Sequence, residues 1–67
     1  MVDVFICKIT PRLIKYRCPF CHKMHTHSNE TGHTDMGLGW QTHRMSHCLK
    51  NDASVNLIVN KDTIRLD

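Results

Sequence analysis

Aromatic side chains are scarce in this sequence, because one Trp, one Tyr and two Phe must serve a chain of 67 residues. A domain of this length buries a modest share of its unfolded surface, so hydrophobic burial alone gives marginal stability. Domains this small usually add disulfide bonds or a structural metal. The sequence therefore predicts one domain over residues 1–67 that depends on such a cross-link.

Long apolar runs are also missing. A membrane-spanning helix needs about 20 predominantly apolar residues, and no segment of this chain approaches that length. Asp3 and Lys8 interrupt the N-terminal stretch, which therefore offers no signal-peptide apolar core. We expect no membrane contact and a cytoplasmic location, where reducing conditions keep cysteines as free thiols.

Glutamate, a common general base of hydrolytic metal sites, is scarce, since Glu30 is the one glutamate in the sequence. A hydrolytic metal site keeps one coordination position open for water and needs a nearby base, often a glutamate. Glu30 falls in a glycine-containing segment, and the chain is too short to build a substantial cleft. No phosphate-binding glycine loop or serine nucleophile motif is present. We therefore expect no enzymatic activity.

Cysteine and histidine, in contrast, are concentrated in the middle of the chain. Three of the four cysteines and all six histidines lie between Cys18 and Cys48. The segment opens with Cys18-Pro19-Phe20-Cys21, and two cysteines at this spacing direct both sulfurs at one point. Thiolate and imidazole ligands suit zinc better than calcium or magnesium. The pattern predicts one structural Zn²⁺ held within residues 18–48.

Cys18, Cys21 and Cys48 are the predicted thiolate ligands, and His43 or His47 is the predicted fourth ligand. If residues 40–48 are extended, His43 lies about 16 Å from Cys48, too far to share one metal. If they are helical, His43 comes within reach of His47 or Cys48. The choice between these two histidines stays open at this point.

Other cysteines and histidines have different predicted roles. His25 and His27 share one face of an expected strand, so they are alternative ligands or groups that fix the site through ring N–H bonds. Cys7 lies within an apolar strand and is expected to be a buried core thiol. His22 and His33 are expected to face solvent.

Short runs of β-branched and apolar residues, separated by turn residues, predict strands. The fold class expected is a small, metal-stabilised, mostly β domain of zinc-ribbon or zinc-knuckle type with at most one short helix. The expected strands are Val2–Ile9, Leu13–Arg17, His22–His27, Val55–Val59 and Thr63–Leu66.

Several details of this fold are also predicted. The first strand is apolar at both parities, which is typical of a central or a covered strand. Residues 28–39 hold all three glycines and are expected to form a flexible loop. Residues 40–48 fit a strand or a short helix. Asn60-Lys61-Asp62 predicts a hairpin turn between the last two strands.

Positive charge is concentrated in the first third of the chain. Residues 1–27 carry five basic side chains against Asp3, a net of +4 within the total of +3. Phe5, Tyr16 and Phe20 are interspersed among them, which is typical of a surface for phosphates and bases. An ordinary solvated strand face is the alternative. The basic residues are Lys8, Arg12, Lys15, Arg17 and Lys23, of which Arg12, Lys15 and Arg17 are the principal candidates.

Trp40 and Arg44 have narrower predictions. We expect Trp40 to be a core anchor that packs over the metal site, and a stacking platform is the alternative. Arg44 is expected to hold the loop or to meet a partner's phosphate or carboxylate.

The combined motif of Cys18-Pro19-x-Cys21, His25-x-His27 and Arg44-x-x-His47-Cys48 resembles a set of small, uncharacterised zinc-binding proteins encoded by bacteriophages. In that set a glycine usually follows the second cysteine and the His-x-His pair, whereas His22 and Ser28 occupy those positions here. The resemblance implies a metal site and a phage origin, and therefore the cytoplasm of an infected or lysogenic bacterium. It implies no activity.

Two functions from different classes are consistent with these features. In the first, the zinc domain is a nucleic-acid-binding module that uses its basic N-terminal third. In the second, it is an accessory protein that binds a host protein in host takeover or in defence against host immunity. The contact would then be made by residues 28–39 or by a sheet edge.

Overall fold

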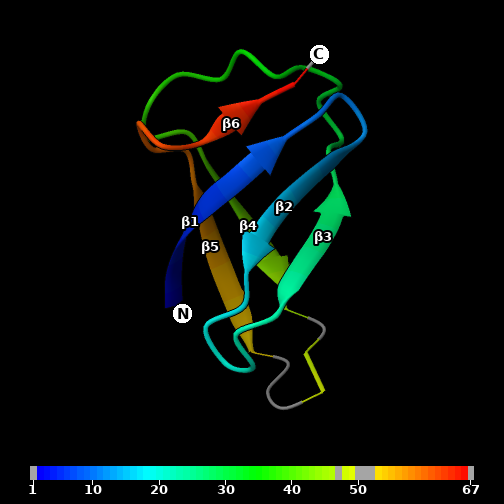
Figure 1. Cartoon of the computed structure of the whole chain (residues 1–67), viewed down its shortest axis with the longest axis vertical. Coiled ribbons are helices and arrows are strands. Elements are labelled where there is room, and N and C mark those ends of the chain that lie inside the picture. The colour runs from blue at the N-terminus through cyan, green and yellow to red at the C-terminus, as the bar shows by residue number, and fades with distance from the viewer. Residues whose placement is uncertain (1, 47, 50–52, 67) are drawn as a thin grey trace.

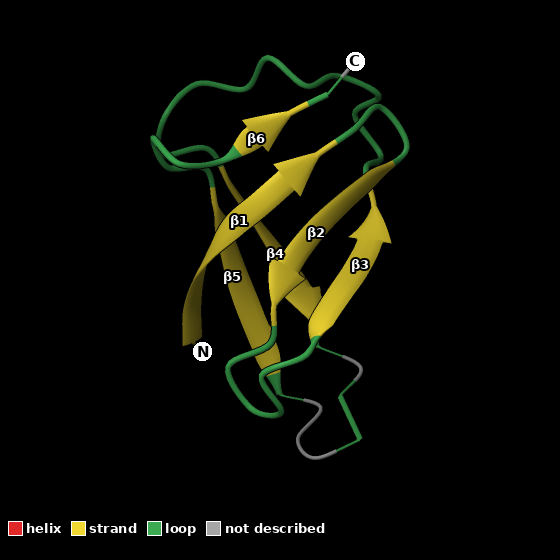
Figure 2. Cartoon of the chain, viewed as in Figure 1, coloured by secondary structure: helices red, strands yellow, loops and turns green. Residues whose placement is uncertain are grey.

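The computed structural model describes residues 2–46, 48–49 and 53–66, and within them the chain is built from six β-strands (Figure 1, Figure 2). This described part of the chain contains no helix, and so none that could cross a membrane. The strands are β1 (Val2–Ile9), β2 (Leu13–Arg17), β3 (Met24–Ser28), β4 (Gln41–Met45), β5 (Ser54–Ile58) and β6 (Ile64–Arg65). The expected small, mostly β fold class is confirmed.

Strand β1 organises the sheet, whose order is β3-β2-β1-β5-β4 with β6 added to β1. The second half of β1 pairs antiparallel with β2. The first half pairs parallel with β5, and Lys8 and Ile9 pair parallel with β6. In Figure 1, β1, β2 and β3 lie in front while β4 and β5 lie behind them, so the twisted sheet bends over its own core.

The predicted hairpin between the last two strands is wrong, because β5 and β6 each pair with β1 and not with each other. The turn signal itself is real, since the Thr63 backbone N–H donates to the Asn60 carbonyl at 3.2 Å. The Thr63 hydroxyl, however, donates to the Ile6 carbonyl at 2.7 Å. This bond holds the turn against β1, so the chain continues along the same strand.

A β-bulge at Cys7 decides which side chains of β1 enter the core. Ile6 pairs with Tyr16 but Lys8 pairs with Lys15, which leaves Cys7 as the extra residue. A bulge shifts the alternation by one residue, so Ile6 and Ile9 are both buried although three positions apart. Cys7 is exposed. The expectation of a core thiol at Cys7 is therefore wrong.

Strand β1 is central in the sheet, one of the two placements that its apolar pattern predicts, but it is not covered on both faces, since Phe5 is 60% exposed. One face of the sheet is covered, and its buried side chains come from three strands and from the residue after β5. Trp40 packs against this core, as expected of an anchor, whereas its predicted position over the metal site stays a prediction. The core side chains are Ile6, Ile9, Ile14, Tyr16, Val55, Leu57 and Val59, extended by Met36, Cys18 and Cys48.

Residues 28–39 contain no strand beyond Ser28, but they are attached to the sheet at several points. The Asn29 amide donates to the carbonyls of Thr10 at 2.8 Å and His33 at 2.7 Å. Arg65 donates to the Met36 carbonyl at 2.7 Å. The flexibility expected of this loop stays a prediction, whereas residues 41–45 form a strand and not a helix.

We predict that Cys7→Ser changes the free energy of unfolding by less than about 0.5 kcal/mol, because an exposed bulge residue contributes little burial. Ile6→Ala, one residue earlier, should cost about 2–5 kcal/mol by opening a core cavity. Urea denaturation of both variants tests this. A cost of about 2 kcal/mol or more for Cys7→Ser would show that the bulge is misplaced.

Candidate metal centre

The turn between β2 and β3 is held by hydrogen bonds centred on Cys18. The Cys18 N–H donates to the Lys23 carbonyl at 2.8 Å, and the His22 N–H donates to the Cys18 carbonyl at 3.0 Å. The Phe20 N–H points at the Cys18 sulfur at 3.4 Å. Because these bonds wrap the chain around Cys18, both sulfurs of the Cys-x-x-Cys pair are presented to the same side of the turn.

His22 completes this turn in a left-handed conformation, with a φ of 64°. That backbone region is unfavourable for a residue with a Cβ and is readily adopted by glycine. The Arg17 guanidinium donates to the His22 carbonyl at 3.0 Å and so braces the strained residue from β2.

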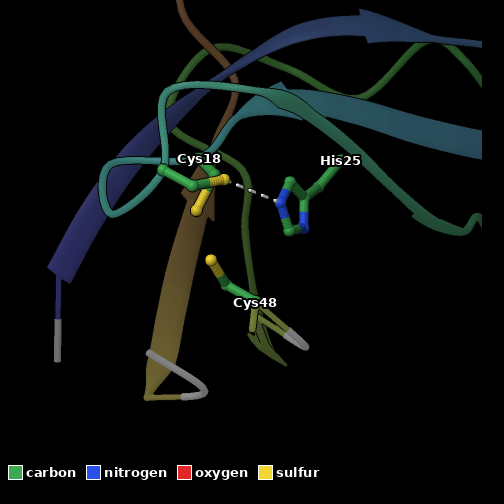
Figure 3. Close-up of side chains that lie close together, drawn as sticks. Cys18, His25 and Cys48 are labelled. Carbon is green, nitrogen blue, oxygen red and sulfur yellow. Dashed lines mark hydrogen bonds between the residues drawn. The ribbon is translucent and has the colours of Figure 1, made fainter. Parts of the chain in front are cut away.

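Four side chains meet at this turn: Cys18, Cys21, His25 and Cys48. Their ligand atoms all lie within 4.8 Å of one another. In a tetrahedral zinc site with Zn–S bonds of about 2.3 Å, neighbouring sulfurs are about 3.8 Å apart. The cluster is therefore close to the size that one metal ion requires, and small side-chain adjustments would complete the shell. Cys18, His25 and Cys48 converge on one point in Figure 3.

Burial strengthens the case for this cluster. Cys18 is fully buried and Cys48 is 5% exposed, while Cys21 and His25 are partly buried. All four cysteines of the chain are free thiols. A group of buried thiols beside an imidazole is the ligand set expected for a soft or borderline cation, and the residues present fit such an ion.

His25 is oriented for metal binding by the backbone that follows β4. Its Nδ1 lies 3.1 Å from the Ser46 carbonyl oxygen, which can only accept, so Nδ1 carries the proton and donates it. Nε2 is then the unprotonated nitrogen, and it faces the Cys21 sulfur at 3.4 Å. A hydrogen bond from the second ring nitrogen is the arrangement that fixes the tautomer of metal-binding histidines.

The same Ser46 carbonyl also accepts a long hydrogen bond from the Tyr16 hydroxyl, at 3.4 Å. Tyr16 in turn stacks on His27, with ring centroids 5.7 Å apart. Burial, followed by the charges of Cys18, Cys48 and Cys21, raises the pKa of Tyr16 to about 12. The phenol therefore stays protonated at neutral pH and remains able to donate.

The pKa of the Cys21 thiol is raised above its usual value. A hydrogen bond with the Lys23 backbone lowers this pKa, but burial and the thiols of Cys48 and Cys18 together outweigh it. Without a metal the thiol is therefore protonated at neutral pH. Because a bound cation must displace that proton, metal affinity at this site falls as pH falls.

The structure brings together the three cysteines that the sequence predicts, but it places His25 with them and not His43. His43 lies on β4 opposite Asn56, with an exposed side chain, because residues 41–45 are extended. His47 lies outside the described residues. The register of β2 with β3, which sets Tyr16 opposite His25, is the feature that directs His25 inward. The spacing of His25 and His27 in the sequence indicated that the two share one face of a strand, but not that this face is turned toward the cysteines.

Three of the five predicted basic residues lie on the outer side of the same sheet. Ile14 and Tyr16 of β2 face the core, so Lys15 and Arg17 alternate outward. Lys8 is the register partner of Lys15 across the bulge. Arg12 and Lys23, both exposed, lie in the turns that precede β2 and β3.

Two aromatic residues expected on this basic surface are elsewhere. Tyr16 is fully buried, and Phe20 packs against the core. The expectation that Tyr16 stacks on a base is therefore wrong, because its position on β2 has inward parity. Phe5 is the exposed aromatic side chain, since Val4 and Ile6 beside it point inward.

A scan of known protein families, a search of the curated proteins and a search of the solved structures each give no match to this chain.

We predict that His22→Gly stabilises the protein. Removing the Cβ relieves the strain of the left-handed backbone, which is about 1–2 kcal/mol. Glycine also opposes folding by about 0.5–1 kcal/mol, because it gives the unfolded chain more conformational entropy. The net gain of about 0.5–1 kcal/mol should raise Tm by about 2–8 °C. Lys23→Gly is the matched control, because Lys23 is exposed and has no positive φ, and it should lower Tm. A lower Tm for His22→Gly would contradict the turn geometry.

Proposed function

We propose that this chain is a non-enzymatic module, stabilised by one structural Zn²⁺, that binds nucleic acid through the outer face of β1 and β2. The observation that carries the proposal is the register pair of Lys8 and Lys15 on that face, with Arg17 two residues further along β2. We call the surface formed by Lys8, Lys15 and Arg17 the basic face.

The donor set of the metal cluster supports zinc. Three thiols and one neutral imidazole form a Cys₃His set, which is common in structural zinc sites. Four protein ligands fill a tetrahedral shell, so no coordination position remains for a reacting water. Zinc here would cross-link the β2–β3 turn to the segment after β4, which supplies the stabilisation that a 67-residue chain lacks from burial alone.

Charge supports a nucleic-acid partner. Among the residues that the structure describes, the ion pair is that of Arg44 with Glu30. No described carboxylate therefore forms an ion pair with the basic face. Lys8 and Lys15 are half-buried, and a half-buried lysine can pack its aliphatic stem while its ammonium group stays in water. Two like charges held opposite each other repel, and a bound phosphate between them removes that repulsion.

Phe5 supplies the aromatic component of the basic face. It lies on the outer side of β1, three residues before Lys8, and is 60% exposed. Exposed aromatic rings beside cations allow bases to stack while phosphates are neutralised, with little sequence preference. The resemblance to phage-encoded proteins favours an accessory role in the cytoplasm of an infected bacterium.

The zinc proposal predicts about one zinc per purified chain and loss of cooperative folding in a strong chelator. Cys18→Ser and His25→Ala should lose the metal, because each removes one of four ligands. His25→Cys should keep it, and so should the matched variant His43→Ala on β4. Elemental analysis and thermal melts measure these outcomes. Zinc lost from His43→Ala and kept by His25→Ala would contradict the ligand set.

The nucleic-acid proposal predicts salt-dependent binding to single-stranded oligonucleotides. Lys15→Gln should weaken binding uniformly across sequences and reduce the slope of log K against log salt by about 1. Lys8→Glu with Lys15→Glu should remove binding at unchanged zinc content. Lys61→Gln is the matched control, since it removes the same charge from the exposed turn before β6. Absence of binding to single- or double-stranded nucleic acid at low salt would overturn the proposal.

A second candidate function is host-protein binding, which one cluster of exposed apolar side chains favours. Leu38 is 72% exposed, Ile64 58% and Leu66 47%. Arg65, between the last two, donates to the Met36 carbonyl of the loop, so β6 and residues 28–39 adjoin. On this alternative, Leu38→Ser abolishes capture of a defined host protein from nuclease-treated lysate, and the double lysine variant retains it.

A further inference from the structure

A cleft of about 270 Å³ lies between the segment that follows β3 and strand β4. On one side it is lined by Glu30 and Thr31, which follow β3, and on the other by Thr42 and Arg44 of β4. Near the cluster, by contrast, His25 of β3 contacts the Ser46 carbonyl after β4. The space between β3 and β4 is therefore closed at one end and open at the other.

The walls of this cleft differ in chemistry. Ile14, fully buried, forms an apolar floor. Trp40 is the one tryptophan of the chain, and it packs against the core while also lining the cleft. An aromatic ring held by the core on one side and open to a cleft on the other is suited to stacking on a flat ligand.

A guanidinium and a carboxylate lie side by side at the cleft. Arg44 Nη2 is 3.9 Å from Glu30 Oε1, which is longer than the about 2.7–3.2 Å of a hydrogen bond. The two groups therefore attract each other without using up their hydrogen-bonding capacity. Arg44 Nη1 donates to the His43 carbonyl at 3.2 Å, which holds the guanidinium against β4.

We propose that this cleft binds one unpaired guanine base of a single-stranded nucleic acid. Its volume is below the about 300–1,000 Å³ of clefts that enclose drug-sized ligands, so it suits a single ring system. Guanine presents two adjacent N–H donors beside a carbonyl acceptor on its Watson–Crick edge. A carboxylate can accept both donors while the neighbouring guanidinium donates to the carbonyl.

The cleft adjoins the turn that carries Arg12. The Asn29 N–H donates to the Arg12 carbonyl at 2.9 Å, and Asn29 also lines the cleft. Arg12 precedes β2, whose outward residues Lys15 and Arg17 belong to the basic face. A strand bound along β2 would thus reach the cleft at the Arg12 end, and in this respect the guanine site rests on the proposed nucleic-acid function.

The test compares an all-thymidine octamer with an octamer that carries one central guanine. Both should bind through the basic face, and the guanine octamer should bind about tenfold more tightly, the discrimination expected of a bidentate base contact. Because Trp40 is the one tryptophan, its fluorescence should be quenched by the guanine octamer and unaffected by the other. Fluorescence anisotropy and intrinsic fluorescence give the two readouts.

Glu30→Ala should remove the guanine preference and leave binding of the thymidine octamer unchanged. Its side chain is 76% exposed, so the variant should fold normally. Asp35→Ala, an exposed acid of the same loop, is the matched control and should keep the preference. Retention of the preference in Glu30→Ala would overturn the proposal.

The outcomes separate this inference from the proposed function. Equal, salt-dependent binding of both octamers without Trp40 quenching overturns the guanine site and leaves the nucleic-acid function intact. If neither octamer binds, the nucleic-acid function and the guanine site are both overturned. Free guanosine monophosphate is the third probe. If it binds as tightly as the guanine octamer, the proposal that the ligand is a base within a single-stranded nucleic acid is overturned.

Discussion

The sheet of this protein bends over its core without closing, and the Cys/His cluster is what joins its two free edges. No ladder among the described residues connects β3 to β4. Cys18, Cys21 and His25 belong to the β2–β3 turn and to β3, whereas Cys48 follows β4. The Ser46 carbonyl accepts hydrogen bonds from both His25 and Tyr16 across the same gap. A metal ion at this point would convert an open, marginal sheet into a cross-linked one, because its binding free energy is folding free energy.

The sheet separates the chemistry of stability from the chemistry proposed for binding. The thiols lie on the covered face with the core, and the cations lie on the outer face. With zinc as the proposed ion, three thiolates, one neutral imidazole and Zn²⁺ would sum to −1 and lower the formal charge of the chain from +3 to +2. Because the thiols and the cations lie on opposite faces, the sheet itself stands between that negative charge and the basic face. Substitutions on the outer face should therefore change binding without changing the fold.

The bulge at Cys7 determines how β1 serves both faces. Without it, strict alternation would place Ile6 and Ile9 on opposite faces. With it, both isoleucines enter the core, while Lys8 becomes the partner of Lys15 on the outside. One extra residue in one strand thus completes the apolar core and also creates the lysine pair of the basic face.

Local features of the sequence were sufficient for the mostly β fold class, for most of the strands and for the three cysteines that meet in the cluster, because strand propensity and the Cys-x-x-Cys turn depend on neighbours in the chain. The fourth member of the cluster was not decided this way. His25 is selected over His43 by the register of β2 with β3 and by the extended form of residues 41–45, both of which are set by pairing between distant segments. The same is true of β6. The turn signal before it was local, but its pairing partner was decided by the part of β1 that β5 leaves unpaired. Burial of Tyr16 and exposure of Cys7 followed from register and from a bulge, which period-2 patterns in a single sequence do not reveal, since a shift of one residue exchanges the two faces of a strand.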